Sequence, residues 1–170
     1  ERPSSATSSA LVKRLLVHRA RTIRRHAARA FAGAVRNGRR PALPAADLTP
    51  LVIAEARACF SLTSILAGLA QDDGVPDWTF EPEFRWLASE VELRIESSRS
   101  DAMTLLSLTG RDDELVSAIE ASRRAPSAER DAQVAELLDV ALPLELSRCL
   151  VPLFERLSLP RFRAQQERYV

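Results

Sequence analysis

Residues that favour helices dominate this chain almost without interruption. Glycine occurs only five times in 170 residues, runs of β-branched residues are few, and Ala, Leu, Glu and Arg are abundant. Such a composition favours helices over strands, and the ten prolines then mark helix ends and kinks. The sequence therefore predicts an all-α protein of stacked helical hairpins, arranged as a short α-solenoid or a helical bundle.

Charge divides the chain into two parts. Residues 1–46 hold eleven of the 24 basic side chains and only one of the 23 acids, Glu1. The net charge of +1 therefore hides a basic N-terminal arm (residues 1–46) joined to an acidic body (residues 47–170). Such an asymmetry predicts a polyanionic partner, an acidic protein surface, or neutralisation of the arm by the chain's own acidic body.

The arm carries one long helical pattern. Ser8 or Ser9 can cap a helix from about Ala10 to Val35, where Asn37 and Gly38 end it. An apolar stripe at helical spacing would dock on the body while the arginines of the opposite stripe face outward. The apolar stripe consists of Val12, Leu16, Ile23, Ala27, Ala30 and Ala34, with Arg19 close to it, and the outward stripe consists of Arg14, His18, Arg21, Arg25, Arg29 and Arg36. The expected partner is the phosphate backbone of RNA, with neighbouring protein subunits on the body. The predicted RNA-binding residues are Lys13, Arg14, Arg21, Arg24, Arg25, Arg29, Arg36, Arg39 and Arg40.

The start of the arm has the composition of an organellar transit sequence. Serines and a threonine at positions 4–9 precede an arginine-rich, acid-poor amphipathic run. We expect a retained arm in a protein of the mitochondrial matrix or another organelle, with the bacterial cytoplasm as the alternative. No run approaches the roughly 18 consecutive apolar residues of a membrane span.

The body shows a succession of helical patterns. The predicted helices cover 47–60, 61–70, 81–95, 98–109, 112–124, 127–140 and 143–157, with a loop at 71–80 and a kink at Pro152 in the last helix. Ser-Asp-Ala-Met-Thr-Leu-Leu at 100–106 is similar to Arg-Asp-Ala-Gln-Val-Ala at 130–135. Glu-Leu-Val-Ser at 114–117 then matches Glu-Leu-Ser-Arg at 145–148, about 30 residues later. This spacing favours stacked helix pairs over an ordinary bundle of similar amphipathic helices.

These helix pairs resemble divergent organellar repeat proteins, the relatives of pentatricopeptide, octotricopeptide and heptatricopeptide arrays. The resemblance covers about Ser61 to Leu157. It implies an RNA-binding or ribonucleoprotein role, although the acidic repeat faces disfavour RNA lying along them.

A second, local resemblance is to the formiminotetrahydrofolate cyclodeaminase and cyclohydrolase family. It rests on Leu-Pro-Leu-Glu at 142–145 and on Asp101 and Ala102. The glycine-rich segment of that family is missing, since Thr49 and Pro50 are followed by Leu-Val-Ile. The resemblance implies an enzyme as one alternative function.

Other reactive residues have structural interpretations. His18 and His26 are expected in solvent or against phosphates. Asp72 and Asp73 form a loop pair, and the acids at 112–114 oppose a helix dipole. Cys59 and Cys149 are expected as buried free thiols. The aromatic cluster Trp78, Phe80, Phe84 and Trp86 favours core packing or a protein interface over base stacking.

The sequence thus predicts a non-catalytic structural or adaptor component of a large assembly, an organellar (mitochondrial) ribosome or another ribonucleoprotein. It predicts no catalytic or metal-ligating residue and no cofactor. The alternatives are an accessory subunit of a respiratory or ATP-synthase complex, whose arm would contact anionic lipid or acidic subunits, and the folate enzyme.

Overall fold

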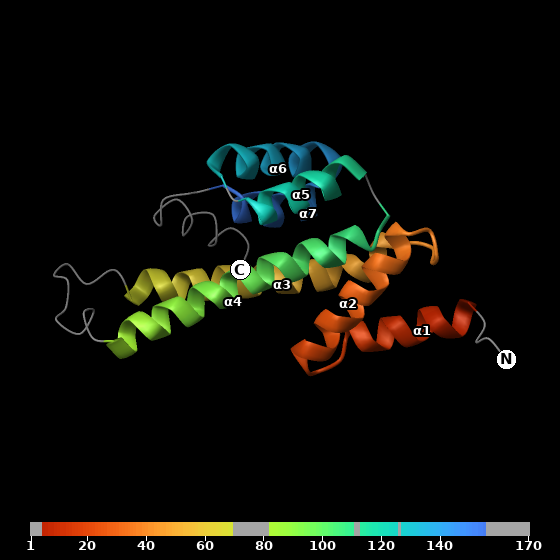
Figure 1. The fold of residues 1–170 in the computed structure, drawn as a ribbon, viewed down its shortest axis with the longest axis horizontal. Helices are drawn as coiled ribbons and strands as arrows, with labels where there is room; N and C mark the ends of the chain where they lie inside the picture. Colours follow the sequence, from red (N-terminus) through yellow and green to blue (C-terminus); the bar gives the residue numbers. More distant parts are fainter. Residues whose placement is uncertain (1–4, 70–81, 111–112, 126, 156–170) are drawn as a thin grey trace.

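The computed structural model describes residues 5–69, 82–110, 113–125 and 127–155. In this part of the chain the regular elements are all helical, which confirms the predicted all-α class. They are α1 (Ser5–Leu16), α2 (Arg21–Arg36), α3 (Ala45–Leu69), α4 (Pro82–Ser107), α5 (Asp113–Arg124), α6 (Ala128–Ala141), α7 (Leu144–Leu150) and the short 3-10 helix η2 (Val151–Leu153). Figure 1 shows the long α3–α4 pair at the centre, with α5–α7 on one side and α1–α2 near one end.

The prediction of one continuous helix from Ala10 to Val35 is wrong. The chain turns between α1 and α2, and the two helices cross at a steep angle (Figure 1). Ala20 has an extended backbone, with φ −78° and ψ 117°, and its N–H donates to Nδ1 of His18 at 3.0 Å. The turn frees α2 to rotate relative to α1, so that the two helices present different faces to the body.

α3 and α4 form an antiparallel hairpin that is longer than predicted. The predicted helices 47–60 and 61–70 merge into α3, and those at 81–95 and 98–109 merge into α4, because neither junction contains glycine or proline. The N–H of Leu43 donates to the carbonyl of Leu108 at 2.9 Å, which joins the start of α3 to the end of α4.

Among the described helices, α3 is the one that is long and apolar enough to cross a membrane by length and composition. The stretch Ala45–Leu66 has a mean hydropathy of 1.3 in its most apolar window, and 28% of that window is buried. The buried part of α3 includes Leu48, Val52, Cys59 and Phe60, which contribute to the protein core. The helix packs mainly against α4 and also against α7.

The C-terminal helices form a second hairpin. The side chain of Ser127 accepts a hydrogen bond from the N–H of Arg130 and caps α6, which begins one residue after the predicted start at 127. α5 packs mainly on α6. The 30-residue spacing instead predicts that the helix at 112–124 pairs with the helix at 98–109, which is the end of α4 in the structure. The predicted helix from Pro143 to Leu157 is wrong in length: α7 ends at Leu150 and continues as η2, because Pro152 cannot donate the next helical hydrogen bond.

One contiguous core joins all of these helices except for the outer parts of the α3–α4 hairpin. Leu16, Phe31, Leu48, Leu108 and Leu138 are among its buried members. Leu105 and Leu106, expected as core residues from the sequence, are 7% and 3% exposed. The core therefore lies where α2, the first half of α3, the second half of α4, and α5–α7 meet.

Candidate nucleic-acid interface

The predicted RNA-binding residues do not lie on one outward face. Five of the nine form ion pairs with acids of the body: Lys13 with Asp47, Arg21 with Glu55 and Asp101, Arg24 with Glu55, Arg25 with Asp101, and Arg36 with Glu120. The expectation that Arg21, Arg25 and Arg36 point away from the body is therefore wrong. The acidic body therefore neutralises much of the arm, through Asp47, Glu55, Asp101 and Glu120.

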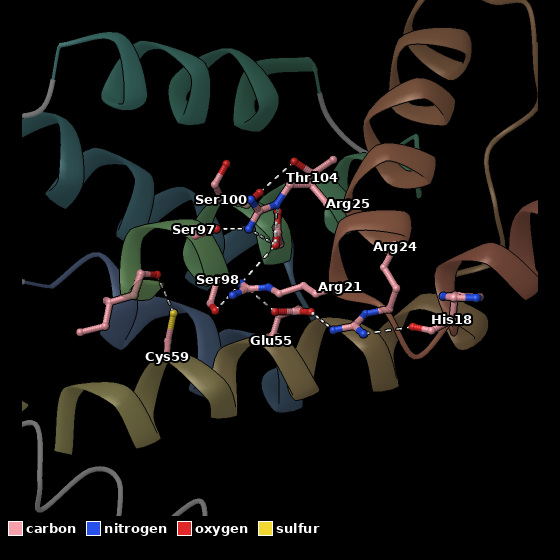
Figure 2. Close-up of polar contacts among 12 residues, drawn as sticks. His18, Arg21, Arg24, Arg25, Glu55, Cys59, Ser97, Ser98, Ser100 and Thr104 are labelled. Atoms are coloured by element: carbon pink, nitrogen blue, oxygen red, sulfur yellow. Dashed lines mark hydrogen bonds and ion pairs between the residues drawn. The ribbon is translucent and has the colours of Figure 1, made fainter. Parts of the chain in front are cut away.

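Three arginines of α2 surround two buried acids. Asp101 on α4 is 6% exposed and Glu55 on α3 is 9% exposed. Arg25 contacts Asp101 with two nitrogens, Nε at 2.9 Å from Oδ1 and Nη2 at 3.0 Å from Oδ2, while Arg21 lies 3.1 Å from Asp101 and 3.3 Å from Glu55 (Figure 2). Such two-pronged pairing with a carboxylate is both strong and geometrically specific. It fixes the rotation of α2 against the α3–α4 hairpin.

Serines of α4 complete this network. Arg21 donates to Oγ of Ser98, and Arg25 donates to Oγ of Ser97 (Figure 2). The hydrogen bonds that Arg25 donates to Asp101 raise the pKa of Arg25 above its ordinary value, against the opposing effect of desolvation. The network therefore holds a fully charged guanidinium at the interface of three helices.

Arg24 supports the turn between α1 and α2. Its guanidinium lies 3.2 Å from Oε1 of Glu55 and donates to the carbonyl of His18 at 3.1 Å (Figure 2). It also donates to the carbonyl of Arg19 at 3.2 Å. These carbonyls follow the C-terminus of α1, where a positive charge is favourable. One side chain of α2 therefore connects α3 with the turn that follows α1.

Sequence reasoning missed Glu55 and Asp101 as partners of the arm. Both residues carried a signal: Glu55 falls on the apolar face of α3, between Val52 and Cys59, and Asp101 belongs to the repeated Asp-Ala motif. The second copy of that motif contains Asp131, which is 5% exposed and pairs with Arg99 at 3.1 Å. An acid at a core position requires a cationic or hydrogen-bonding partner, which this sequence supplies with arginine.

The other predicted RNA-binding residues remain accessible. Arg14, Arg29 and Arg39 are exposed and Arg40 is half-buried, and none of them is ion-paired to a residue that the structure describes. Arg19, which the sequence placed near the apolar stripe, is exposed in the same way. We name Arg14, Arg19, Arg39 and Arg40 the outer arginines. They lie on α1, in the turn after it, and in the linker before α3.

The apolar face of the arm also differs from the predicted one. Ile23 is 40% exposed, whereas Ala28, Phe31 and Ala32 are buried. The predicted stripe offered only alanines after Ile23, and the face that is buried instead combines Phe31 with the arginines that reach Glu55 and Asp101. Ion pairing and one large aromatic side chain therefore outweigh the alanine stripe.

The cysteines are free and buried, as predicted. Desolvation raises the pKa of Cys59 to about 12 and that of Cys149 to about 11. Cys59 donates its S–H to the carbonyl of Ile95 at 3.2 Å. Both thiols are therefore protonated near neutral pH and poor nucleophiles.

The remaining candidate residues have local roles. Nδ1 of His26 lies 2.7 Å from the carbonyl of Thr22, and the described ranges contain no group of three or more His, Cys, Asp or Glu able to hold a metal ion. The expectations for Asp72, Asp73, Trp78 and Phe80 lie outside the described residues. Trp86 is 67% exposed, which contradicts core packing for this aromatic residue and leaves a protein interface open.

Comparison with protein-family models, with curated proteins and with solved structures gives no match to this chain. The resemblances to organellar repeat proteins and to the folate enzyme family therefore stay hypotheses.

Proposed function

We propose that this protein is a non-catalytic adaptor in an organellar ribonucleoprotein, a mitochondrial ribosome or a related particle. In this proposal the outer arginines hold RNA phosphates and the helical body contacts protein. The network around Glu55 and Asp101 is then the device that fixes the basic element to the body. The proposal assigns no reaction to the chain.

The observation that carries the proposal is the division of the arm's cations into two groups. Arg21, Arg24 and Arg25 are turned toward buried acids, whereas the outer arginines have no carboxylate partner among the described residues. An arginine that the protein itself does not neutralise keeps its planar donor fork for a phosphate. The sequence-independent character of such contacts fits a structural role on RNA.

Exposed apolar residues of the α3–α4 hairpin support a protein partner for the body. Trp86 and Leu93 lie two helical turns apart on α4 and are 67% and 65% exposed, and Ile65 on α3 is 53% exposed. Acidic neighbours, among them Glu92 and Glu96, make this surface unsuited to RNA. Tryptophan is enriched in protein interfaces, where it often contributes much of the binding free energy.

Fluorescence anisotropy with a short structured RNA tests the RNA contact. We expect binding in the micromolar range at moderate salt, an order-of-magnitude value for backbone contacts, and a steep dependence on salt concentration. Replacing the outer arginines with Glu should weaken binding by about tenfold or more and flatten the salt slope. The variant R21E/R25E is unsuitable, because it would also break the ion pairs with Glu55 and Asp101.

A matched control changes the same charge elsewhere. Arg57, Arg85, Arg94 and Arg148 are exposed arginines of the body, and their replacement with Glu alters net charge equally. This control should bind RNA with nearly the native salt slope. Equal affinity and equal slope in the native protein and the outer-arginine variant would reject the outer arginines as an RNA anchor.

A second function, an accessory subunit of a respiratory or ATP-synthase complex, is favoured by one specific feature. Leu11 and Val17 are 55% and 66% exposed beside Arg14 and Arg19, a combination that suits anionic lipid or an acidic subunit. Co-sedimentation with vesicles containing cardiolipin separates the two functions. Vesicle binding that L11S/V17S abolishes, without RNA binding, would favour the accessory subunit.

A further inference from the structure

A cavity of about 440 Å³ lies between α2 and α4 on one side and α5, α6 and Phe154, which follows η2, on the other. Its apolar wall includes Ala32, Met103, Val116, Ile119 and Phe154. Met103 and Phe154 are buried, whereas Val116 and Ile119 are half-buried. This volume falls within the range of about 300–1,000 Å³ in which proteins bind small organic molecules.

Two ion pairs cross the cavity and neutralise most of its charge. Arg36 on α2 pairs with Glu120 on α5, and Arg99 on α4 pairs with Asp131 on α6 at 3.1 Å. Glu96, another acid in the lining, lies 3.6 Å from Arg99. Each acid of the lining therefore already has an arginine.

Three of the four hydroxyl side chains of the lining donate within the protein. Thr104 donates to the carbonyl of Ser100 at 2.8 Å, and Ser107 donates to the carbonyl of Thr104 at 2.8 Å. Ser122 donates to Oδ1 of Asp131 at 2.6 Å. These groups can accept a hydrogen bond from a ligand, but their hydrogens are used.

Arg29 differs from Arg36 and Arg99, the other two arginines of the lining. It lines the cavity and is exposed, and no residue that the structure describes forms an ion pair with it. Arg29 lies beside a cavity wall in which apolar side chains alternate with hydroxyl groups and ion-paired charges. A free guanidinium next to the apolar part of this wall suits a ligand with an apolar body and one carboxylate, since charge-assisted pairing with arginine is strong. The unbranched Met103 side chain can adapt to a flexible chain.

We propose that this cavity binds an amphipathic carboxylate, an acyl chain that lies against Met103 and Phe154 while its carboxylate pairs with Arg29. The site is independent of the RNA contact and requires none of the outer arginines. Its occupant would lie between the two halves of the molecule and would add apolar contacts across them.

Met103 provides a direct probe, because it is the one methionine of the sequence. Full-length protein labelled with ¹³C at the methionine methyl is titrated with decanoate below its micelle concentration. We expect a saturable shift of the Met103 methyl resonance. Arg29→Gln should raise the Kd for decanoate about tenfold or more, because it removes a charge-assisted bond. Arg148→Gln, an exposed arginine outside the cavity, should leave the Kd unchanged.

Neutral decanol distinguishes the apolar contact of the chain from the pairing of the carboxylate with Arg29. Its affinity should be lower than that of decanoate and should not respond to Arg29→Gln. Val116→Trp fills the cavity from a half-buried position and should abolish the methyl shift. The proposal is overturned if decanoate gives no saturable shift, if Arg29→Gln binds it as well as the native protein does, or if a folded Val116→Trp variant still binds it.

Discussion

At the scale of residues, buried acids determine how the arm meets the body. Glu55 and Asp101 occupy core positions of α3 and α4, where both carboxylates lose their contact with water. Without a cationic partner, this desolvation would destabilise the fold. Arg21 and Arg25 form ion pairs with these carboxylates, although the arginine side chains are 27% and 28% exposed. The face of α2 that contacts the body is therefore the one with the arginines, not the one with the most alanines.

Asp101→Asn should test this interpretation. Asparagine keeps the size of the side chain but removes the charge that Arg21 and Arg25 share, so we expect a loss of about 1–3 kcal/mol in the free energy of unfolding. Urea denaturation measures the change. The matched control is Glu90→Gln, which removes an exposed i,i+4 pair with Arg94 and should cost less than about 0.5 kcal/mol. Equal effects of the two variants would contradict a structural role for the network.

The buried thiols make the stability of the protein depend on pH. Burial raises the pKa of Cys59 from 9.0 to about 12, so the folded state holds this proton more tightly than the unfolded state does. Its contribution to stability is full below pH 9 and is lost as the pH rises toward 12. At pH 8.5, iodoacetamide should alkylate both cysteines at least about tenfold more slowly in native protein than in urea, as mass spectrometry would show. Rapid alkylation of either thiol in the native protein would contradict this result.

At the scale of elements, helix ends depend on contacts far along the chain. Gly38 and Gly110 follow α2 and α4, and both have φ of +64°, a conformation that favours glycine. The linker before α3 passes close to the end of α4, where Leu43 donates to Leu108. The two glycines therefore share a backbone conformation but differ in their surroundings.

This difference makes a matched pair of variants. A Cβ at Gly110 would lie 2.8 Å from Cβ of Ala42, whereas a Cβ at Gly38 would meet nothing within 4 Å. Gly38→Ala should cost about 1 kcal/mol from backbone strain alone, and Gly110→Ala about 2–4 kcal/mol because the linker must also move. Thermal and urea unfolding measure both. Equal costs would show that the linker yields without penalty.

At the scale of the whole molecule, polar contacts join two halves, α1–α4 and α5–η2. Arg99 on α4 reaches Asp131 on α6 and lies 4.0 Å from the ring centre of Phe154, which follows η2. Arg36 and Glu120 form a second link between α2 and α5. α7 also packs on α3 through apolar side chains.

Arg99→Gln should weaken the contact between the two halves. It removes the arginine that lies 3.1 Å from Asp131, a carboxylate that is 5% exposed, and we expect a loss of about 2–3 kcal/mol in the free energy of unfolding. Hydrogen exchange should show α5 and α6 losing protection before α3 and α4 do. Arg94→Gln, on the same helix but exposed, should change neither quantity. Uniform loss of protection throughout the chain would indicate that the halves unfold as one unit.

The sequence by itself determined the helical class, the end of a helix at Gly110, the burial of both cysteines and of Leu105 and Leu106, and the excess of positive charge in the arm. These properties follow from local preferences and from hydropathy, which act over a few residues. The break between α1 and α2, the merging of α3 and of α4, and the pairing of Arg21, Arg24 and Arg25 were decided by tertiary structure alone. Helical spacing cannot tell an arginine in solvent from one that meets a buried acid 76 residues away, as Arg25 meets Asp101. Whether an arginine stays in solvent or pairs with an acid depends on the free energy of desolvating the carboxylate. The carboxylate is desolvated only once the helices pack together.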